Sequence, residues 1–184
     1  MKIDGKDYKI KTTLYRTKGS HNQSLGDELP DDRAIETRRR FYIGERNGRK
    51  YFIKEYSDKD YGSGELNFPK NIEYEFNETK KLRGSIEVDG GEIDVPRVVA
   101  MEDNKIVFEY LEGYKKLANQ AFNEWGHETI QTLVRAWVSE KPVRNYDLCN
   151  NNIMYLSDGE SISLRMIDFE MSASRNPKKE LGIE

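Results

Sequence analysis

The segment from Asn145 to Ala173 contains two acidic residues and one asparagine at a spacing that suits a metal site on a nucleotide. Asp147 is followed five residues later by Asn152, and Asp168 comes after two short apolar runs that a Ser-Asp-Gly turn separates. The runs predict a β-hairpin, which brings the residue before its first strand and the residue after its second strand to the same end. We therefore expect Asp147, Asn152 and Asp168 to converge, and such a set of side chains points to phosphoryl transfer.

This spacing resembles the catalytic loop of the protein-kinase superfamily, in which D-x-x-x-x-N precedes a hairpin and a D-F-G motif. It is closer still to the choline and ethanolamine kinase and aminoglycoside phosphotransferase branch, where H-N-D-L-x-x-x-N-I and I-D-F/W-E-Y are the usual forms. The resemblance implies that Asp147 takes or orients the proton of the attacking hydroxyl. It also implies that Asn152 and Asp168 hold Mg²⁺ on the phosphates of ATP, because hard cations prefer oxygen ligands.

A second hairpin is predicted upstream, where two alternating strands, 38–46 and 49–57, flank Asn47-Gly48, a pair typical of type I′ turns. Lys54 lies inside the second strand in the sequence Y-F-I-K. The resemblance to V-A-I-K implies that its ammonium group pairs with the α- and β-phosphates of ATP.

The next predicted element is a helix over residues 69–83, which has a proline near its start, good helix formers inside and a glycine after its end. The resemblance implies that a glutamate of this helix pairs with Lys54. Glu75 and Glu78 lie on one side of the helix. We expect Glu78 to be the partner, because a leucine follows it four residues later as in the kinase helix, and Glu75 is the second choice.

Two further strands, 95–100 and 105–111, are predicted around a Glu-Asp-Asn turn. The sequence I-V-F-E-Y-L-E-G resembles the strand and hinge that join the two lobes of a kinase. It implies that backbone groups of Glu109, Tyr110 and Leu111 form hydrogen bonds with adenine.

The predicted architecture is α+β, a two-lobed protein-kinase-like fold with a reduced C-lobe. Residues 1–111 would form the N-lobe, an antiparallel sheet with one helix that binds ATP. Residues 112–184 would form a minimal C-lobe with the catalytic hairpin and two helices, predicted over 115–125 and 128–139 from the helical spacing of their apolar residues. A lone D-x-x-x-x-N is more often a pair of turn residues, and it is the order of four signals along the chain that favours the kinase interpretation.

The chain also departs from the kinase pattern. No G-x-G-x-x-G precedes Lys54, and Asn145-Tyr146-Asp147 stands in place of H-R-D. Glu170 replaces the glycine of D-F-G, as in the choline-kinase branch, and sixteen residues follow Asp168, too few for an activation segment with peptide-binding helices. These departures bear on the substrate class and on regulation more than on nucleotide binding.

The composition predicts an ordinary water-soluble chain. Its 184 residues include 30 basic and 33 acidic side chains, a net charge of −3, so nucleic acid and anionic membranes are not expected partners. A single cysteine excludes an internal disulfide, and no signal peptide or membrane-length apolar run is present. We expect a cytoplasmic protein, or one delivered to another cell by a signal-independent route.

These observations favour an ATP- and Mg²⁺-dependent phosphotransferase that moves the γ-phosphate to a hydroxyl. A protein serine or threonine is narrowly preferred as acceptor over a small alcohol or an aminoglycoside, whose kinases build acceptor pockets from additional C-terminal helices. Two alternatives stay open, a catalytically silent pseudokinase and a nucleotidyl transferase that moves AMP on the same fold.

Overall fold

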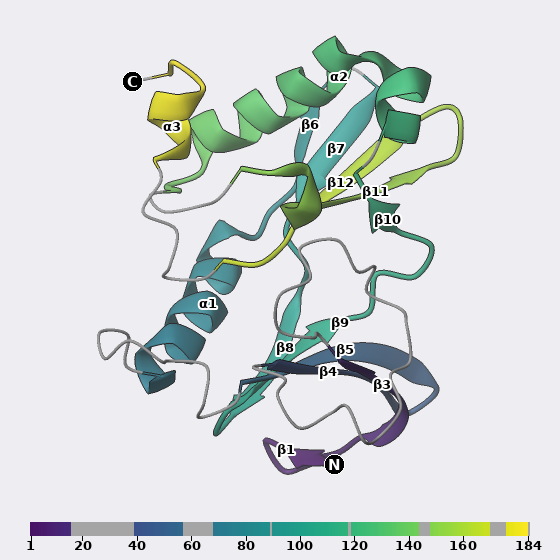
Figure 1. Cartoon of the computed structure of the whole chain (residues 1–184), viewed down its shortest axis with the longest axis vertical. Helices are drawn as coiled ribbons and strands as arrows, with labels where there is room; N and C mark the ends of the chain where they lie inside the picture. The colour runs from purple at the N-terminus through teal and green to yellow at the C-terminus, as the bar shows by residue number, and fades with distance from the viewer. Residues whose placement is uncertain are drawn as a thin grey trace. The chain divides into compact units, whose positions relative to one another are not determined.

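A computed structural model describes residues 1–15, 39–56, 68–88, 90–117, 119–143, 148–169 and 176–183. Helices and strands are both well represented among them, which confirms the predicted α+β class (Figure 1). The chain divides into two compact units. The first comprises Met1–Phe76 and Val98–Tyr110, and the second comprises Asn77–Arg97 and Leu111–Glu184.

The first unit is built on a five-stranded antiparallel sheet with the order β3-β4-β5-β9-β8. Its strands are β3 (Lys9–Tyr15), β4 (Arg39–Arg46), β5 (Arg49–Tyr56), β8 (Val98–Glu102) and β9 (Lys105–Glu109), and a small hairpin of β1 (Lys2–Ile3) and β2 (Lys6–Asp7) precedes them. Asn47 and Gly48 join β4 to β5 with φ angles of 52° and 71°, as a type I′ turn requires. The predicted hairpin around Lys54 is therefore confirmed.

Helix α1 (Phe68–Leu82) follows the predicted range closely. Its buried positions are Ile72, Glu75, Thr79 and Leu82, which recur at the spacing of one helical face. In the first unit, Ile72 packs in one apolar cluster with Tyr56, Ile106 and Phe108 of the sheet. Glu75 therefore occupies a buried position on the helical face that otherwise carries core residues.

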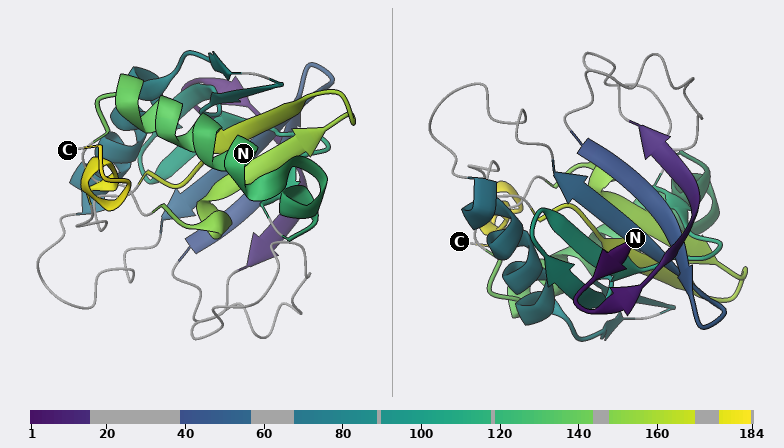
Figure 2. Two further views of the ribbon diagram at one scale, coloured as in Figure 1. Left: turned by 90° about the horizontal axis from the view of Figure 1, so that it is seen from above. Right: turned by 90° about the horizontal axis from the view of Figure 1, so that it is seen from below.

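The second unit contains a mixed sheet with the order β10-β11-β12-β7-β6. The strands are β6 (Ile86–Val88), β7 (Gly91–Asp94), β10 (Lys115–Lys116), β11 (Ile153–Ser157) and β12 (Ile162–Met166), and β7 pairs with β12 in parallel. Helix α2 (Asn119–Glu140) lies over this sheet (Figure 2, left), and a short helix α3 (Pro177–Glu180) follows near the end. The expected hairpin of the C-terminal half is confirmed as β11 and β12.

The core of the second unit lies between α2 and the sheet. The apolar side chains that were expected at helical spacing are all buried there, namely Ile130, Leu133, Val134, Trp137 and Val138. A Cβ atom on Gly91 of β7 would lie 2.8 Å from side-chain atoms of both Leu133 and Ile162, so only glycine allows this approach of the helix to the sheet.

Two predictions about elements are corrected, and one is confirmed. The helix expected over 115–125 begins at Asn119, because Lys115 and Lys116 pair with β11. The two expected helices are confirmed as the two segments of α2, which are separated at Gly126, whose non-helical φ of 77° and ψ of 154° only glycine adopts readily. The strand expected over 95–100 begins at Val98, and β6 and β7 before it were not predicted.

The expected division of the chain is also corrected in part. The chain crosses between the two units at three points, and the last crossing, between Tyr110 and Leu111, is close to the expected boundary at residue 111. Asn77–Arg97, however, belongs to the second unit and not to the expected N-lobe, because β7 pairs with β12 and β6 pairs with β7.

Among the described residues, no helix is both long enough and apolar enough to cross a membrane.

Candidate active site

Lys54 lies near the end of β5, and its side chain extends from the face of the sheet that packs against α1. Its Nζ atom is 3.0 Å from Oε1 of Glu75, and the exposed fractions of the two side chains are 5% and 2%. The hydroxyl of Tyr56 donates a hydrogen bond to Oε2 of the same carboxylate. A lysine of a strand and a glutamate of the following helix are therefore paired within the first unit.

The prediction that Glu78 is the partner of Lys54 is wrong. Glu78 pairs with Lys81 at 3.2 Å, one turn further along α1. The physical reason is the helical period, since Glu75 falls in the buried stripe with Ile72 and Leu82, whereas Glu78 falls outside it. The apolar residue that follows Glu78 four positions later was a less reliable signal than the position of the whole stripe.

Burial makes the Lys54 and Glu75 pair unusual as a structural feature. Removing two charges from water costs several kcal/mol for each ion, and this cost is about as large as the attraction between the charges. Apolar side chains of similar volume therefore often stabilise a buried position as well as an ion pair does, or better. The buried pair by itself is therefore weak evidence for stability.

Asn152 and Asp168 lie at the same end of the hairpin β11-β12, as predicted. Ile153 is opposite Met166 in the ladder, and the backbone nitrogen of Ile167 donates to the carbonyl oxygen of Asn152 at 2.9 Å. Asn152 ends a short 3-10 turn, and Asp168 has a φ of 69°, a left-handed conformation that few residues other than glycine, asparagine and aspartate tolerate. The hairpin thus brings one amide and one carboxylate side chain to one end of two adjacent strands.

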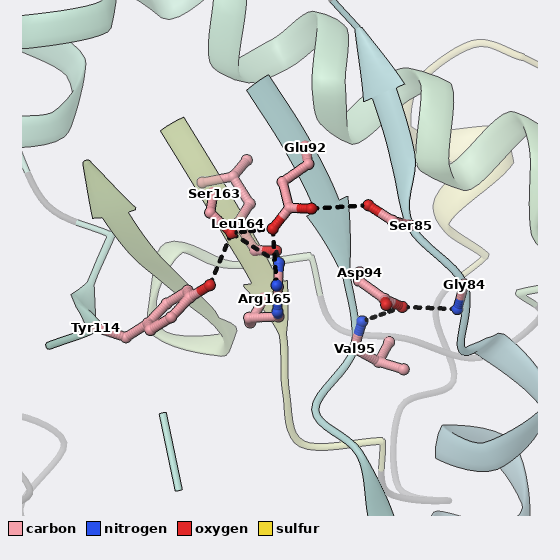
Figure 3. Close-up of polar contacts among 9 residues, drawn as sticks. All are labelled: Gly84, Ser85, Glu92, Asp94, Val95, Tyr114, Ser163, Leu164 and Arg165. Carbon is pink, nitrogen blue, oxygen red and sulfur yellow. Dashed lines mark hydrogen bonds and ion pairs between the residues drawn. The ribbon is translucent and has the colours of Figure 1, made fainter. Parts of the chain in front are cut away.

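A polar network on the sheet of the second unit connects β12 to β7 (Figure 3). Oε1 of Glu92 accepts hydrogen bonds from Ser163 at 2.6 Å and from Arg165 at 2.8 Å. The hydroxyl of Ser85 donates to the other oxygen of Glu92 at 3.0 Å, and the hydroxyls of Tyr114 and Ser163 are 2.7 Å apart. Because β12 leads directly to Asp168, these contacts help to fix the strand that positions the expected metal ligand.

The electrostatics of this network are favourable for an ionised Glu92. The hydrogen bond from Ser163 is the main cause that lowers the pKa of the Glu92 carboxyl below its ordinary value, and Arg165 lowers it further against the opposing effect of burial. The guanidinium of Arg165 also lies 5.4 Å from the centroid of the Tyr114 ring. Ser163, Arg165 and Glu92 therefore form a charged connection between the parallel strands.

The other expected site residues are placed less completely. Asp147, the expected catalytic base, lies outside the described residues, as does Glu170. Glu109 is the last residue of β9, and Tyr110 and Leu111 follow it where the chain passes from the first unit to the second. Nζ of Lys50 lies 5.5 Å from the centroid of the Tyr110 ring.

Within the described ranges, no three side chains of His, Cys, Asp or Glu lie close enough together to hold a metal ion. The expected pair of Asn152 and Asp168 is not such a group, since it has one amide and one carboxylate. Both would supply oxygen atoms, which are the ligands that Mg²⁺ prefers, and Mg²⁺ commonly takes only one or two protein ligands besides phosphates and water. The donor types therefore fit Mg²⁺.

Two residues of these sites were not predicted. Tyr56 could have been found, because alternation along a strand puts it on the same face as Lys54. Glu92 could not have been found, since the four-residue strand that carries it gives no clear pattern.

The sequence matches no protein-family model, and no curated protein shows significant similarity to it.

Proposed function

We propose that this protein is an ATP- and Mg²⁺-dependent phosphotransferase that moves the γ-phosphate to a hydroxyl group, with a two-lobed, protein-kinase-like arrangement of its units. The observation that carries the proposal is the buried ion pair of Lys54 and Glu75 at 3.0 Å. A kinase-like site requires a lysine on an N-terminal strand and a glutamate on the following helix, and Lys54 of β5 and Glu75 of α1 form such a pair.

Lys54 would pair with the phosphates of ATP, and Glu75 would hold its ammonium group in place. An ammonium group attracts phosphate oxygens strongly in a water-poor setting. Glu109, Tyr110 and Leu111 remain the proposed contacts of adenine.

Asn152 and Asp168 would hold Mg²⁺, which when bound would neutralise charge on the phosphates. Their common position at one end of the hairpin supports this role, as does the left-handed backbone at Asp168, a kind of strain found often at functional sites. Asp147 would accept or orient the proton of the attacking hydroxyl. The proposed acceptor is a protein serine or threonine, ahead of a small alcohol or an aminoglycoside.

The proposal is tested by incubating the protein with γ-labelled and α-labelled ATP in parallel, with Mg²⁺ or Mn²⁺, alone and with a cell extract. We expect transfer of the γ-label to an acceptor. Transfer of the α-label would identify a nucleotidyl transferase, and ATP binding without transfer of either label would identify a silent pseudokinase.

Two variants sharpen this experiment. Lys54→Ala should abolish transfer, whereas Glu78→Ala, which changes the same helix outside its buried stripe, should transfer the label at the rate of the wild type. Separation of the labelled products into protein and small-molecule fractions then identifies the class of acceptor.

A further inference from the structure

Tyr56 contacts both members of the buried ion pair. It lies two residues after Lys54 on β5, so the two side chains extend from the same face of the strand. Its hydroxyl donates to Oε2 of Glu75 while Lys54 pairs with Oε1, and Nζ of Lys54 is 5.1 Å from the centroid of the Tyr56 ring. Two alternate residues of one strand thus hold the two oxygens of one carboxylate.

Tyr56 is itself firmly anchored. Its side chain is fully buried and packs with Ile72, Ile106 and Phe108. Its backbone nitrogen donates to the carbonyl oxygen of Asn104 at 2.9 Å, and the side-chain nitrogen of Asn104 donates to the carbonyl oxygen of Tyr56 at 2.6 Å. The position of the tyrosine side chain is therefore set by contacts other than its hydrogen bond to the carboxylate.

The hydrogen bond from Tyr56 restricts the terminal torsion of Glu75, which the ion pair with Lys54 alone would leave free to rotate. The terminal torsion of a glutamate is broad and nearly two-fold, so a carboxylate with one partner can present either oxygen at a range of angles. A hydrogen bond from a neutral hydroxyl to a charged oxygen is short and directional. With both oxygens occupied, Glu75 offers Lys54 a single orientation.

We propose that Tyr56 is the positioning residue of this site, and that its hydroxyl fixes Glu75 so that the ammonium of Lys54 is presented in one orientation to the phosphates of a nucleotide. The orientation of the pair stands on the contacts in the first unit, and only its consequence for the nucleotide rests on the proposed function.

The same unit offers a matched control. The hydroxyl of Tyr42 donates to Glu55, and Lys105 pairs with Glu55 at 3.0 Å, which makes a second Tyr-Glu-Lys set. Glu55 alternates with Lys54 along β5, so this set lies on the opposite face of the sheet. Tyr42→Phe therefore removes the same chemical group from a similar but more exposed set without touching Lys54.

The first measurement needs no nucleotide. The ammonium signal of a lysine in a ¹H-¹⁵N spectrum is visible only when its protons exchange slowly with water, and the Lys54 signal is assigned by its loss in Lys54→Arg. We expect the signal to be retained in the wild type and in Tyr42→Phe, and its protons to exchange roughly fivefold faster or more in Tyr56→Phe. An unchanged Lys54 signal in Tyr56→Phe would overturn the proposal.

The wild type provides a second readout, in case Tyr56→Phe folds poorly. A tyrosine hydroxyl proton donated to a buried carboxylate should give a protected signal with a cross-peak to the Tyr56 ring, and its absence would also overturn the assignment. With ATP, Tyr56→Phe should lower kcat roughly tenfold and change the Kd of ATP less than about threefold, since orientation matters most in the transition state. A purely structural role would lower the melting temperature and leave kcat unchanged.

The outcomes separate this inference from the proposed function. A Lys54 signal that responds to Tyr56→Phe in a protein that transfers no label would support the positioning role and contradict the phosphotransferase. If the wild type transfers the label, and the Lys54 signal and kcat are unchanged in Tyr56→Phe, the phosphotransferase is supported and the positioning role is contradicted.

Discussion

Lys54 and Glu75 are 21 residues apart in the sequence and form an ion pair of 3.0 Å in which both side chains are shielded from water. A strand and the helix that follows it each contribute one member, so the contact exists only when α1 packs on β5. Its formation is thus linked to the folding of the first unit.

The first prediction compares the two glutamates of α1. Glu75→Ala leaves the ammonium of Lys54 buried without its partner, which should lower the free energy of unfolding by about 3–5 kcal/mol. Glu78→Ala removes a more exposed pair and should change it by less than about 0.5 kcal/mol. Urea unfolding followed by circular dichroism measures both values, and equal effects of the two variants would contradict the assignment of Glu75.

The second prediction concerns metal. Asp168→Asn keeps the size of the side chain and tolerates the left-handed backbone, so the melting temperature of the protein without nucleotide should change little. In the wild type, Mg²⁺ should increase the thermal stabilisation by ATP, and this increase should disappear in the variant. Differential scanning calorimetry with and without Mg²⁺ gives the comparison.

Asp158→Asn is the control for that experiment. Asp158 lies in the turn at the other end of the hairpin and accepts hydrogen bonds from Glu160 and Ser161. Its replacement should lower the melting temperature slightly and leave the effect of Mg²⁺ intact. If Asp158→Asn and Asp168→Asn respond alike to Mg²⁺, Asp168 does not bind the metal.

The third prediction separates chemistry from binding. Asp147→Ala should lower kcat by on the order of a hundredfold or more with ATP affinity nearly retained, because a catalytic base acts chiefly in the transition state. Lys54→Ala should impair both kcat and affinity, since its ammonium would contact the phosphates directly. Isothermal titration calorimetry and steady-state kinetics measure the two quantities, and severe loss of ATP binding in Asp147→Ala would refute its role as base.

The fourth prediction is a pH dependence. The pKa of Glu92 is lowered below its ordinary value of 4.5, first by the hydrogen bond from Ser163 and further by Arg165. A group with a lowered pKa in the folded protein stabilises it above the unfolded value, and this contribution is lost as the pH falls through the folded value. Glu92→Gln should therefore be less stable than the wild type near neutral pH, and the difference should shrink below pH 4.5.

Urea unfolding at several pH values tests this, with Ser163→Ala as a companion variant. Loss of the Ser163 hydroxyl removes the largest cause of the lowered pKa, so the acid loss of stability should begin at a higher pH than in the wild type. A stability difference between wild type and Glu92→Gln that stays constant down to strongly acidic pH would show that Glu92 does not titrate as proposed.

The sequence by itself determined the local elements. The Asn47-Gly48 turn fixed the first hairpin because both residues tolerate positive φ, and the apolar runs around the Ser-Asp-Gly turn fixed the second. Helical spacing likewise identified the buried face of α2, from Ile130 to Val138. These features depend on interactions between residues near one another in the chain, so their signals are contained in short windows.

Tertiary structure decided which residues meet across the chain. It selected Glu75 over Glu78, because packing of α1 on the sheet sets the direction of its buried face. It also placed Gly91–Asp94 beside β12, a pairing between segments about seventy residues apart that leaves almost no local pattern in four residues. Long-range pairing depends on the shape of the assembled sheet and on the helix that covers it, and neither is encoded in any one segment.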